Sequence, residues 1–453
     1  MSARRLITRR RLIALSTTLP ASGAAATVAC SGPAVRNDAA PTAAAGPVTL
    51  RAVLTSGVAS LLKDEVPVVP SFEAANPNVK VEIELSSAGW DQEHRDKFLA
   101  KLAAGEAMDA WFVPTDWAPS YGKRSALLDL HPLLAKQRGV NVKDYWQPPL
   151  AAASYQGKLY ALPYSVMTNV MWFNLDLLAP AGLKVPPPTW TWTDFLAMAQ
   201  TMARTTGDGG GNAIWGHVGS LTSLRTMGFP FIWANGGRLF DDDSMPRTLA
   251  LDPAAAEALQ WYADLTVRHH VAPTTAEMQA VGFPNGGALF NAGRAALSAG
   301  SAGFRGLKQS VKGLFRYDCQ VLPAGKAGRA AATWADCLSL PATTRQPDTA
   351  ARFLAHATGP AGARLLAPLG ANLPSIESIA RSKEWVEADG LNRPAALDTI
   401  ARARPVPPSP TWPDVMTQAL EPLWADLHTG KKTAADGLRE IKPKVDDLLR
   451  TAG

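Results

Sequence analysis

Residues 157–195 read GKLYALPYSVMTNVMWFNLDLLAPAGLKVPPPTWTWTDF, and this stretch decides the fold. A Gly-Lys turn leads into two extended runs, the second of which ends at Asn174. A short helix then closes at Gly182, three prolines follow, and a new helix begins near Thr191. Two extended runs are thus followed by two helices.

The sequence before this stretch predicts three strands separated by helices. Apolar and polar residues alternate over 48–54 and again over 79–85, and residues 109–113 form a third, apolar run. Helical stretches at 60–75 and 91–104 lie between them. This β-α-β-α-β order predicts a parallel sheet wrapped by helices. Ligands of such sheets bind beyond the carboxyl ends of the strands.

Three helix starts in the second half carry capping residues. Thr191 with Asp194, and Thr433 with Asp436, have the spacing of a capping box. Asp252 precedes a proline at the first helical position. The last helix is expected to be interrupted by its internal proline.

The length and charge of the chain indicate how many lobes it has and which class of partner it does not bind. With 453 residues the chain exceeds one hydrophobic core, so two lobes are expected. The net charge is +6, but residues 1–29 hold five arginines and no acid, so the rest of the chain carries 6 − 5 = +1. A charge of +1 leaves no basic excess to attract a phosphate polymer, and nucleic acid is not expected as a partner.

The N-terminus resembles an export signal. Residues 8–13 read TRRRLI, which fits the twin-arginine pattern, and a weakly apolar run follows to residue 29. The run ends at Cys30 in a sequence that resembles a lipobox, so we expect Cys30 to carry lipid; a plain signal cleavage with an incidental cysteine is the alternative. Residues 30–47 are small, polar and proline-interrupted, and predict a flexible tether. No other stretch reaches the roughly 20 apolar residues of a membrane span, so membrane contact is expected through the lipid alone.

Motifs for metals, cofactors and catalysis are not found in the sequence. The seven histidines are scattered, and the acidic run at 241–243 lacks the spaced ligands of a calcium loop, so neither a metal nor a cofactor is expected. The loop at 207–212 follows no strand and precedes no Lys-Ser/Thr, which argues against a phosphate loop. No Gly-x-Ser-x-Gly, His-Glu-x-x-His or Cys-x-x-Cys occurs. A pair of carboxylates that converges in space stays open as the basis of a secreted carbohydrate-active enzyme.

Further motifs in the right order carry a family resemblance. Together with the opening stretch, the chain resembles the bacterial extracellular solute-binding proteins of ABC importers, in the branch that carries sugars and glycerol phosphates. The motifs are FEAANP at 72–77, AAGEAMD at 103–109, LLDL at 127–130, WANGGRLF at 233–240 with the helix at 258–265, FNAGRAAL at 290–297 and LPAG at 322–325. Met108 replaces the proline that is usual in the second of them.

The resemblance implies a periplasmic-binding-protein-like α/β fold and a function without catalysis. Two discontinuous α/β lobes would be joined by a three-segment hinge, with the ligand cleft between them and closure by hinge motion. The expected crossovers lie near Tyr164, Trp334 and Ile400, which gives a first lobe of 48–163 and 335–399 and a second lobe of 164–334 and 400–453. The protein would be a monomer outside the cytoplasmic membrane, on the cell surface or the periplasmic side. There it would capture a mono- or oligosaccharide and deliver it to the ABC permease.

The resemblance also points to ligand-binding residues. Sugars offer hydroxyls to carboxylates and apolar faces to aromatic rings. Asp116 follows the third strand, and Trp412 follows the third crossover, so the two are expected to clamp a sugar from opposite sides, with neither in a core. The other candidates, for which packing is the alternative role, are Trp117, Tyr164, Trp233, Asn235, Phe304, Arg305, Trp334 and Asp336.

Two of these candidates leave the ligand class open. Phe304 stands where the family often has a stacking tryptophan. Arg305 could face a phosphate or carboxylate, so a non-sugar solute such as glycerol phosphate, a polyamine or a peptide is the alternative ligand.

The two remaining cysteines suggest a disulfide. Cys319 and Cys337 lie in extended runs on either side of a turn-like region at 323–328. An antiparallel hairpin centred there would place them opposite each other, within reach of a disulfide outside the cytoplasm. Two free, buried cysteines are the alternative.

Overall fold

The computed structural model describes residues 46–87, 92–205, 213–219, 223–243, 245–407 and 409–451. These ranges all belong to one unit, Gly46–Gly453. The predicted signal peptide, the lipidation site Cys30 and the tether up to residue 45 lie outside the described residues, as does the loop at 207–212.

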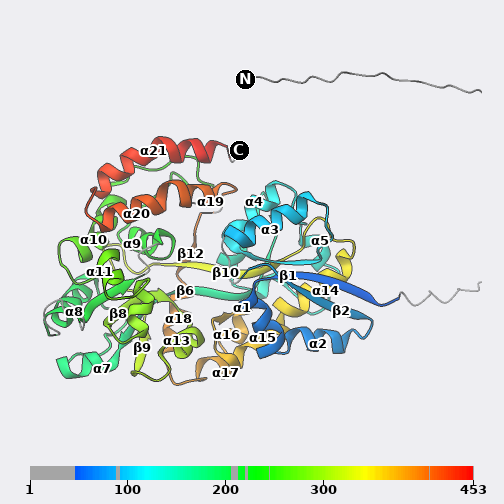
Figure 1. Ribbon diagram of the computed structural model, residues 1–453, viewed down its shortest axis with the longest axis horizontal. Coiled ribbons are helices and arrows are strands. Elements are labelled where there is room, and N and C mark those ends of the chain that lie inside the picture. Colours follow the sequence, from blue (N-terminus) through cyan, green and yellow to red (C-terminus); the bar gives the residue numbers. More distant parts are fainter. Residues whose placement is uncertain are drawn as a thin grey trace, which may run out of the picture. The chain divides into compact units, whose positions relative to one another are not determined.

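A sheet of ten strands forms the centre of this unit (Figure 1). Seven strands follow the order β2-β1-β3-β10-β6-β8-β7, while β9 and β11 pair with β6, and β12 pairs with β10. Their bounds are β1 Val48–Leu54, β2 Val79–Leu85, β3 Ala110–Pro114, β6 Leu162–Asn174, β7 Trp215–Gly219, β8 Ala295–Ser301, β9 Tyr317–Gln320, β10 Ala331–Ser339, β11 Leu373–Pro374 and β12 Ala403–Pro405. We call the end of the sheet with β1, β2 and β3 the β1–β3 side, and the end with β7, β8 and β9 the β7–β9 side.

The three N-terminal strands confirm the predicted parallel arrangement. β1 is parallel to β2 along its whole length and parallel to β3. β10 is antiparallel to both β3 and β6, so it joins the β1–β3 side to the rest of the sheet.

The opening stretch of the sequence forms the longest strand. The two expected extended runs are one continuous strand, β6, which pairs with β10 in its first half and with β8 and β9 in its second. The side chain of Asn174 ends the strand by accepting backbone hydrogen bonds from Asp176 and Leu177 in α7 (Leu175–Leu178). The following turn closes at Gly182 with a φ of 69°, a conformation that glycine adopts without strain.

Helices lie on both faces of the sheet. In Figure 1, α3, α4 and α21 lie above it, and α2, α13 and α18 lie below it. The longer helices are α2 Val68–Ala75, α3 Gln92–Ala103, α8 Trp192–Thr205, α10 Pro253–Val267, α13 Phe304–Val311, α14 Pro347–Thr358, α18 Arg393–Ile400, α20 Glu421–His428 and α21 Ala434–Arg450, and α4 covers Ala118–Lys123. None of the helices in the described ranges combines the length and the apolar content that crossing a bilayer requires.

The predicted helix starts are confirmed. The Asp194 carboxylate accepts from the backbone N–H and hydroxyl of Thr191, and Thr191 Oγ1 accepts in return from the Asp194 N–H. Thr433 caps α21, and Asp252 caps α10 ahead of its proline. The expected interruption is wrong, because α21 continues through Pro443 as one helix.

The predicted disulfide is wrong in this structure. Cys319 and Cys337 are free and fully buried. Their strands do not form a hairpin; each pairs with β6, Cys319 opposite Trp172 and Cys337 opposite Pro163. Nine residues of strand separate those two positions, about 30 Å at roughly 3.3 Å per residue. A disulfide needs Cα atoms within about 7 Å.

The exact lobe boundaries stay a prediction. Tyr164 lies in β6, Trp334 lies in β10, and Ile400 ends α18 shortly before β12. The three expected crossovers are thus strands, or the approach to a strand, at the centre of the sheet.

Candidate functional site

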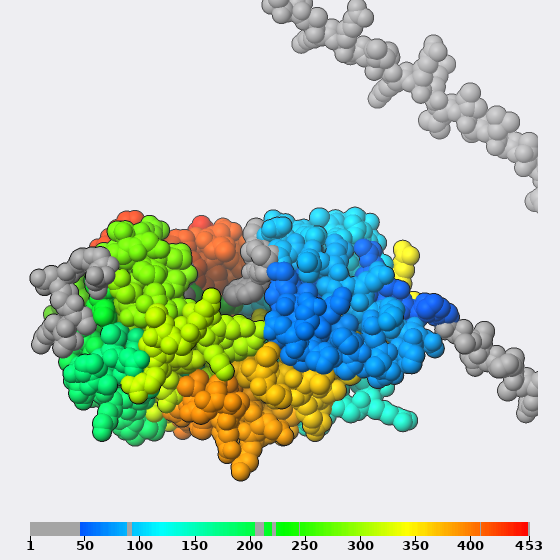
Figure 2. Space-filling model, turned by 60° about the horizontal axis from the view of Figure 1, so that its bottom comes forward, coloured from blue at the N-terminus to red at the C-terminus, as the bar shows by residue number. Residues whose placement is uncertain are grey.

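The surface is hollowed between two groups of segments. Figure 2 shows this hollow between the blue N-terminal segments and the green segments near the middle of the chain. The carboxyl ends of β1 and β3 point from the β1–β3 side toward the rest of the sheet, so residues just after these strands are placed to reach such a hollow.

A buried ion pair links the two sides. Asp116 lies in η2 (Thr115–Trp117), directly after β3, and Arg225 lies in η5 (Leu224–Gly228), which contacts β8 on the β7–β9 side. Nη1 of Arg225 donates to Oδ2 of Asp116 at 2.9 Å, and the two side chains are only 10% and 8% exposed. Oδ1 of Asp116 is buried without a hydrogen-bond partner.

The central strand β10 adds an aromatic ring and a second carboxyl group. The guanidinium of Arg225 lies 5.7 Å from the ring centre of Trp334. Asp336 follows two residues later, on the same face of the strand. Burial raises the pKa of Asp336 to about 7; the charge of Arg225 opposes this rise and the charge of Asp116 adds to it.

A third carboxyl group comes from the start of α20. Burial raises the pKa of Glu421 to about 7, against the opposing effects of a hydrogen bond from the Leu224 backbone and of the Arg225 charge. Its Oε2 atom is buried without a partner. We call Asp116, Arg225, Trp334, Asp336 and Glu421 the Arg225 cluster.

The Arg225 cluster can accept hydrogen bonds from a bound molecule. Oδ1 of Asp116 and Oε2 of Glu421 are acceptors that a buried hydroxyl or ammonium group would satisfy. Three carboxyl groups lie near one guanidinium, and when the two whose pKa is raised to about 7 are ionised, the cluster favours ligands with donor groups over anions. The described residues contain no group of three or more His, Cys, Asp and Glu side chains arranged to hold a metal ion.

Trp412 lies beside the cluster but in the core. It begins α19 (Trp412–Val415), which contacts η2, and its side chain is fully buried. Its ring centre lies 5.9 Å from that of Phe229 and 6.0 Å from that of Phe240. The expectation that Trp412 is not a core residue is therefore wrong, because aromatic neighbours of the β7–β9 side enclose it.

Phe304 and Arg305 lie away from the Arg225 cluster, at the start of α13. Phe304 is fully buried, with its ring centre 5.2 Å from Trp172 and 4.4 Å from the guanidinium of Arg393. Arg305 forms an ion pair with Glu65 of η1 (Ser60–Glu65). In this structure the first residue packs in the core, and the charge of the second is balanced by a carboxylate.

The other predicted residues have local partners. Trp117 is half-buried and stacks at 6.5 Å on His94. Tyr164 is buried, and burial first, then the charge of Asp336, raises its pKa. Trp233 lies under the guanidinium of Arg404 at 5.6 Å. Asn235 donates to the Ala254 carbonyl at 2.9 Å and to Glu257 at 3.0 Å.

The structure therefore brings together Asp116, Trp334 and Asp336, and adds two residues that sequence reasoning missed. Arg225 and Glu421 belong to no motif, and no pattern around them signals a site. Only the topology reveals them: it places η5 against β10, with Arg225 on Asp116, and it places Glu421 at the start of α20 beside the Leu224 backbone.

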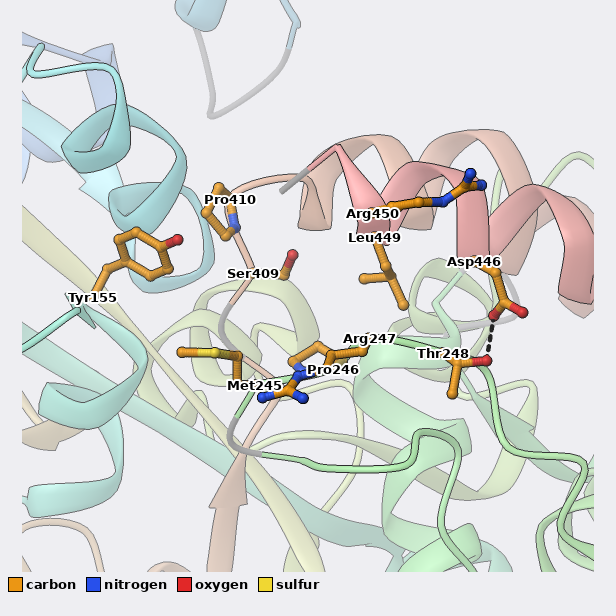
Figure 3. Close-up of a pocket in the computed structure, with 10 residues that line it drawn as sticks. All are labelled: Tyr155, Met245, Pro246, Arg247, Thr248, Ser409, Pro410, Asp446, Leu449 and Arg450. Carbon is orange, nitrogen blue, oxygen red and sulfur yellow. Dashed lines mark hydrogen bonds between the residues drawn. The ribbon is translucent and has the colours of Figure 1, made fainter. Parts of the chain in front are cut away.

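A separate groove carries none of the predicted residues. Its volume is about 470 Å³, and Figure 3 shows Tyr155 on one wall and residues of α21 and the 245–248 and 409–410 segments on the other. The Asp446 carboxylate in this wall already accepts hydrogen bonds from Thr248 Oγ1 at 2.8 Å and the Leu249 N–H at 2.7 Å. The remaining walls are mainly apolar. Asp243, in a pocket that shares Tyr155 and Met245 with this groove, has one buried carboxylate oxygen without a partner. The Arg225 cluster has two such oxygens around an ion pair that links the two sides, and it is therefore the candidate site.

Comparison with known proteins gives related sequences and folds. A mannitol-binding protein of Pseudomonas aeruginosa is 28% identical over 275 residues, which cover 56% of this chain and 58% of that protein. The chain spans about half the length of the curated relatives it matches.

Solved structures share the fold over nearly their whole length. An ABC substrate-binding protein from Listeria monocytogenes in complex with cycloalternan has a TM-score of 0.76 at 21% identity, covering 89% of this chain and 99% of that one. UgpB from Mycobacterium tuberculosis in complex with glycerophosphocholine also has a TM-score of 0.76, at 22% identity, covering 90% and 99%. The predicted periplasmic-binding-protein-like fold is confirmed.

The family assignment follows from a match over most of the chain. Residues 52–364 match the bacterial extracellular solute-binding proteins, and this range holds Asp116, Arg225, Trp334 and Asp336 of the Arg225 cluster. This protein belongs to the family of bacterial extracellular solute-binding proteins.

Proposed function

We propose that this chain is the substrate-binding component of an ABC importer and that it captures a carbohydrate in the hollow at the Arg225 cluster. The observation that carries the proposal is the pair of buried carboxylate oxygens without partners, Oδ1 of Asp116 and Oε2 of Glu421. A buried acceptor without a donor costs roughly 1–3 kcal/mol, and sugar hydroxyls would supply the missing donors. The carbohydrate-related relatives and fold neighbours support this ligand class.

The charges disfavour an anionic solute. Two arginines of the β7–β9 side already have carboxylate partners on the β1–β3 side: Arg225 faces Asp116, and Arg305 faces Glu65. A phosphate or carboxylate would compete with these partners and would meet Asp336 and Glu421 as well. Among the non-sugar alternatives, an amine-bearing solute such as a polyamine fits the acidic excess best, a peptide fits less well, and glycerol phosphate fits least.

Binding without chemical conversion is part of the proposal. The family consists of solute-binding proteins, and in the cluster Asp116 is paired with Arg225, whose guanidinium also lies over the ring of Trp334. A bound solute would be released unchanged to the transmembrane subunits of the permease.

Location is proposed from the N-terminal sequence. Export through the twin-arginine signal and lipidation of Cys30 would anchor a monomer to the outer side of the cytoplasmic membrane. The residues from 31 to 47 would then tether the solute-binding body to the lipid.

A thermal-shift panel tests the ligand class. Mannitol, cycloalternan, glycerophosphocholine and spermidine are compared, because a ligand at 100 times its Kd stabilises the folded protein by about 2.7 kcal/mol. We expect a rise in melting temperature with mannitol or cycloalternan. A rise with spermidine alone would favour the amine-bearing class, and a rise with glycerophosphocholine alone would contradict the charge argument. The variant Glu421→Gln should reduce the shift, whereas Asp447→Asn, on the exposed face of α21, should leave it unchanged.

A further inference from the structure

A second ion pair joins the two sides at the rim of the hollow. Glu65 ends η1, which contacts α2 and α1 (Ser56–Ala59) on the β1–β3 side. Arg305 lies in the first turn of α13, after β8 on the β7–β9 side, and forms an ion pair with Oε2 of Glu65. Figure 2 shows the blue and yellow-green surfaces, which contain these two segments, meeting at one edge of the hollow.

We propose that Glu65 and Arg305 form a latch that holds the two sides of the hollow together. The two residues are positioning residues: they would set how much of the protein is closed, and thereby its affinity, without touching the solute. The proposal rests on the proposed function only in treating the hollow as the solute cleft.

Both ends of the latch are held by their own side. Ser60 Oγ donates to Oε1 of Glu65 at 3.2 Å, which leaves Oε2 for Arg305. On the other side, Phe304 fixes the start of α13 because its ring packs against Trp172 in the second half of β6 and against Arg393 of α18, a helix that contacts β9. The two charges are thus presented from ordered segments, which lowers the conformational entropy lost when the pair forms.

Exposure distinguishes this pair from the one at the cluster. The side chains of Arg305 and Glu65 are 22% and 31% exposed, whereas those of Arg225 and Asp116 are 10% and 8% exposed. Water can therefore solvate the separated charges of the latch when the sides move apart, so the pair can break and re-form at a modest cost. Salt should weaken it, because screening acts on partly exposed charges.

The latch should act on affinity through the closing equilibrium. A solute that contacts both sides binds the closed form better, so any change in the closed fraction changes the apparent Kd by the same factor when that fraction is small. An exposed ion pair corresponds to a change of about two- to five-fold in this equilibrium.

Pulsed electron–electron double resonance on the ligand-free protein tests the latch. Spin labels are attached in a Lys63→Cys, Ser310→Cys protein, since both positions are exposed and lie on opposite sides of the rim. Cys30→Ser leaves Cys319 and Cys337 as the other cysteines of the labelled protein, and both are fully buried. We expect Glu65→Gln and Arg305→Gln each to increase the population of longer distances by about two- to five-fold. The charge swap Glu65→Arg with Arg305→Glu should restore the shorter distances.

A matched ion pair within one side serves as the control. Asp176 and Arg316 pair at 2.7 Å on the β7–β9 side, and Asp176→Asn with Arg316→Gln should leave the distance distribution unchanged. Raising the salt concentration to 1 M should lengthen the distances in the protein with the latch and not in Arg305→Gln. The latch would be overturned by unchanged distances in both single variants. It would also be overturned if the protein with the charge swap kept the longer distances. These distance measurements need no solute. They can therefore contradict the latch without contradicting sugar binding, and the thermal-shift panel can contradict sugar binding without contradicting the latch.

Discussion

Nη1 of Arg225 lies 2.9 Å from Oδ2 of Asp116, and this buried contact joins the end of β3 to a segment of the β7–β9 side. The sequence predicts a ligand contact for Asp116, with the capping of a loop as the alternative, yet here Asp116 also balances a buried positive charge. Its role in binding and its role in stability are therefore coupled.

Asp116→Ala should lower the stability of the ligand-free protein. Removing one partner of a buried ion pair typically costs about 3–5 kcal/mol, because the other charge stays behind in a poorly solvated place. Urea unfolding checks the free energy of unfolding. Asp176→Asn, which removes a 43% exposed carboxylate from an arginine, should lower the free energy of unfolding far less, because water solvates both separated groups. Equal effects of the two substitutions would show that the Asp116 pair is not a buried one in solution.

The stability of the protein should fall as the pH rises from about 4 to about 7. Burial raises the pKa of Asp336 from 3.8 to about 7 and that of Glu421 from 4.5 to about 7. In this window the unfolded chain releases protons that the folded chain retains. The two carboxyl groups therefore contribute their full share of stability below the pKa values of the unfolded chain, and this share is lost as the pH rises to the pKa values of the folded protein.

Replacement of the carboxyl group tests this dependence. Asp336→Asn should flatten the fall in melting temperature across that window and should be more stable than the unmodified protein at pH 8. Asp447→Asn, on an exposed part of α21, should keep the unmodified slope. A slope that is the same in Asp336→Asn would show that this carboxyl group ionises at its ordinary pKa.

Trp412→Ala should destabilise the protein by about 3–5 kcal/mol, as large-to-small substitutions in a core do. The indole is fully buried against Phe229 and Phe240, and its Nε1 has no hydrogen-bond partner. Trp412→Phe should cost less, since it keeps an aromatic ring and removes the unpartnered N–H. Guanidinium unfolding of both variants checks the order; a loss of solute affinity at unchanged stability would instead identify Trp412 as a ligand residue.

Both cysteines of the described chain should be free. Mass spectrometry of unreduced protein, alkylated after denaturation, should find modified Cys319 and Cys337. Alkylation of the native protein should modify neither, because burial raises the pKa of both thiols and removes them from solvent. A mass lower by two hydrogens, with no alkylation after denaturation, would restore the disulfide.

We predict that lipid attachment depends on Cys30. Cys30→Ala should leave the protein either unprocessed or released from the membrane fraction, which immunoblotting of cell fractions measures. A substitution two residues later, Gly32→Ala, is a suitable control because it retains the cysteine. Normal processing and normal membrane recovery of Cys30→Ala would rule out the anchor.

Local patterns predicted the elements well because neighbouring residues determine them. The alternation at Val48–Leu54 and Val79–Leu85, and the caps at Thr191 and Thr433, depend on side chains a few positions apart. The parallel pairing of the first three strands was predicted from the alternation of strands and helices along the chain. The continuity of β6 was not predicted, although residues 165–168 between its two halves contain neither glycine nor proline.

The site was only half predictable because topology assembles it. Asp116 follows a strand end, where a parallel sheet places its ligands, but Arg225 and Glu421 reach it from segments with no motif. The hairpin expected for Cys319 failed for the same reason: equal spacing about a turn does not reveal that both strands pair with a third. A tryptophan such as Trp412 gives no sign in sequence of which way it faces.

The place of β10 in the sheet has a consequence for synthesis. Strands β1 to β3 and strands β6 to β8 are all made before residue 331, yet β10 is the strand that lies between the two groups. A nascent chain that stops short of Ala331 has two sheet fragments with no ladder between them, and each fragment leaves an unpaired edge. Such edges invite wrong pairing during translation. The chain is therefore exposed to wrong pairing until its last quarter, which begins with β10, has been made. C-terminal truncations should be recovered as aggregates rather than as isolated lobes.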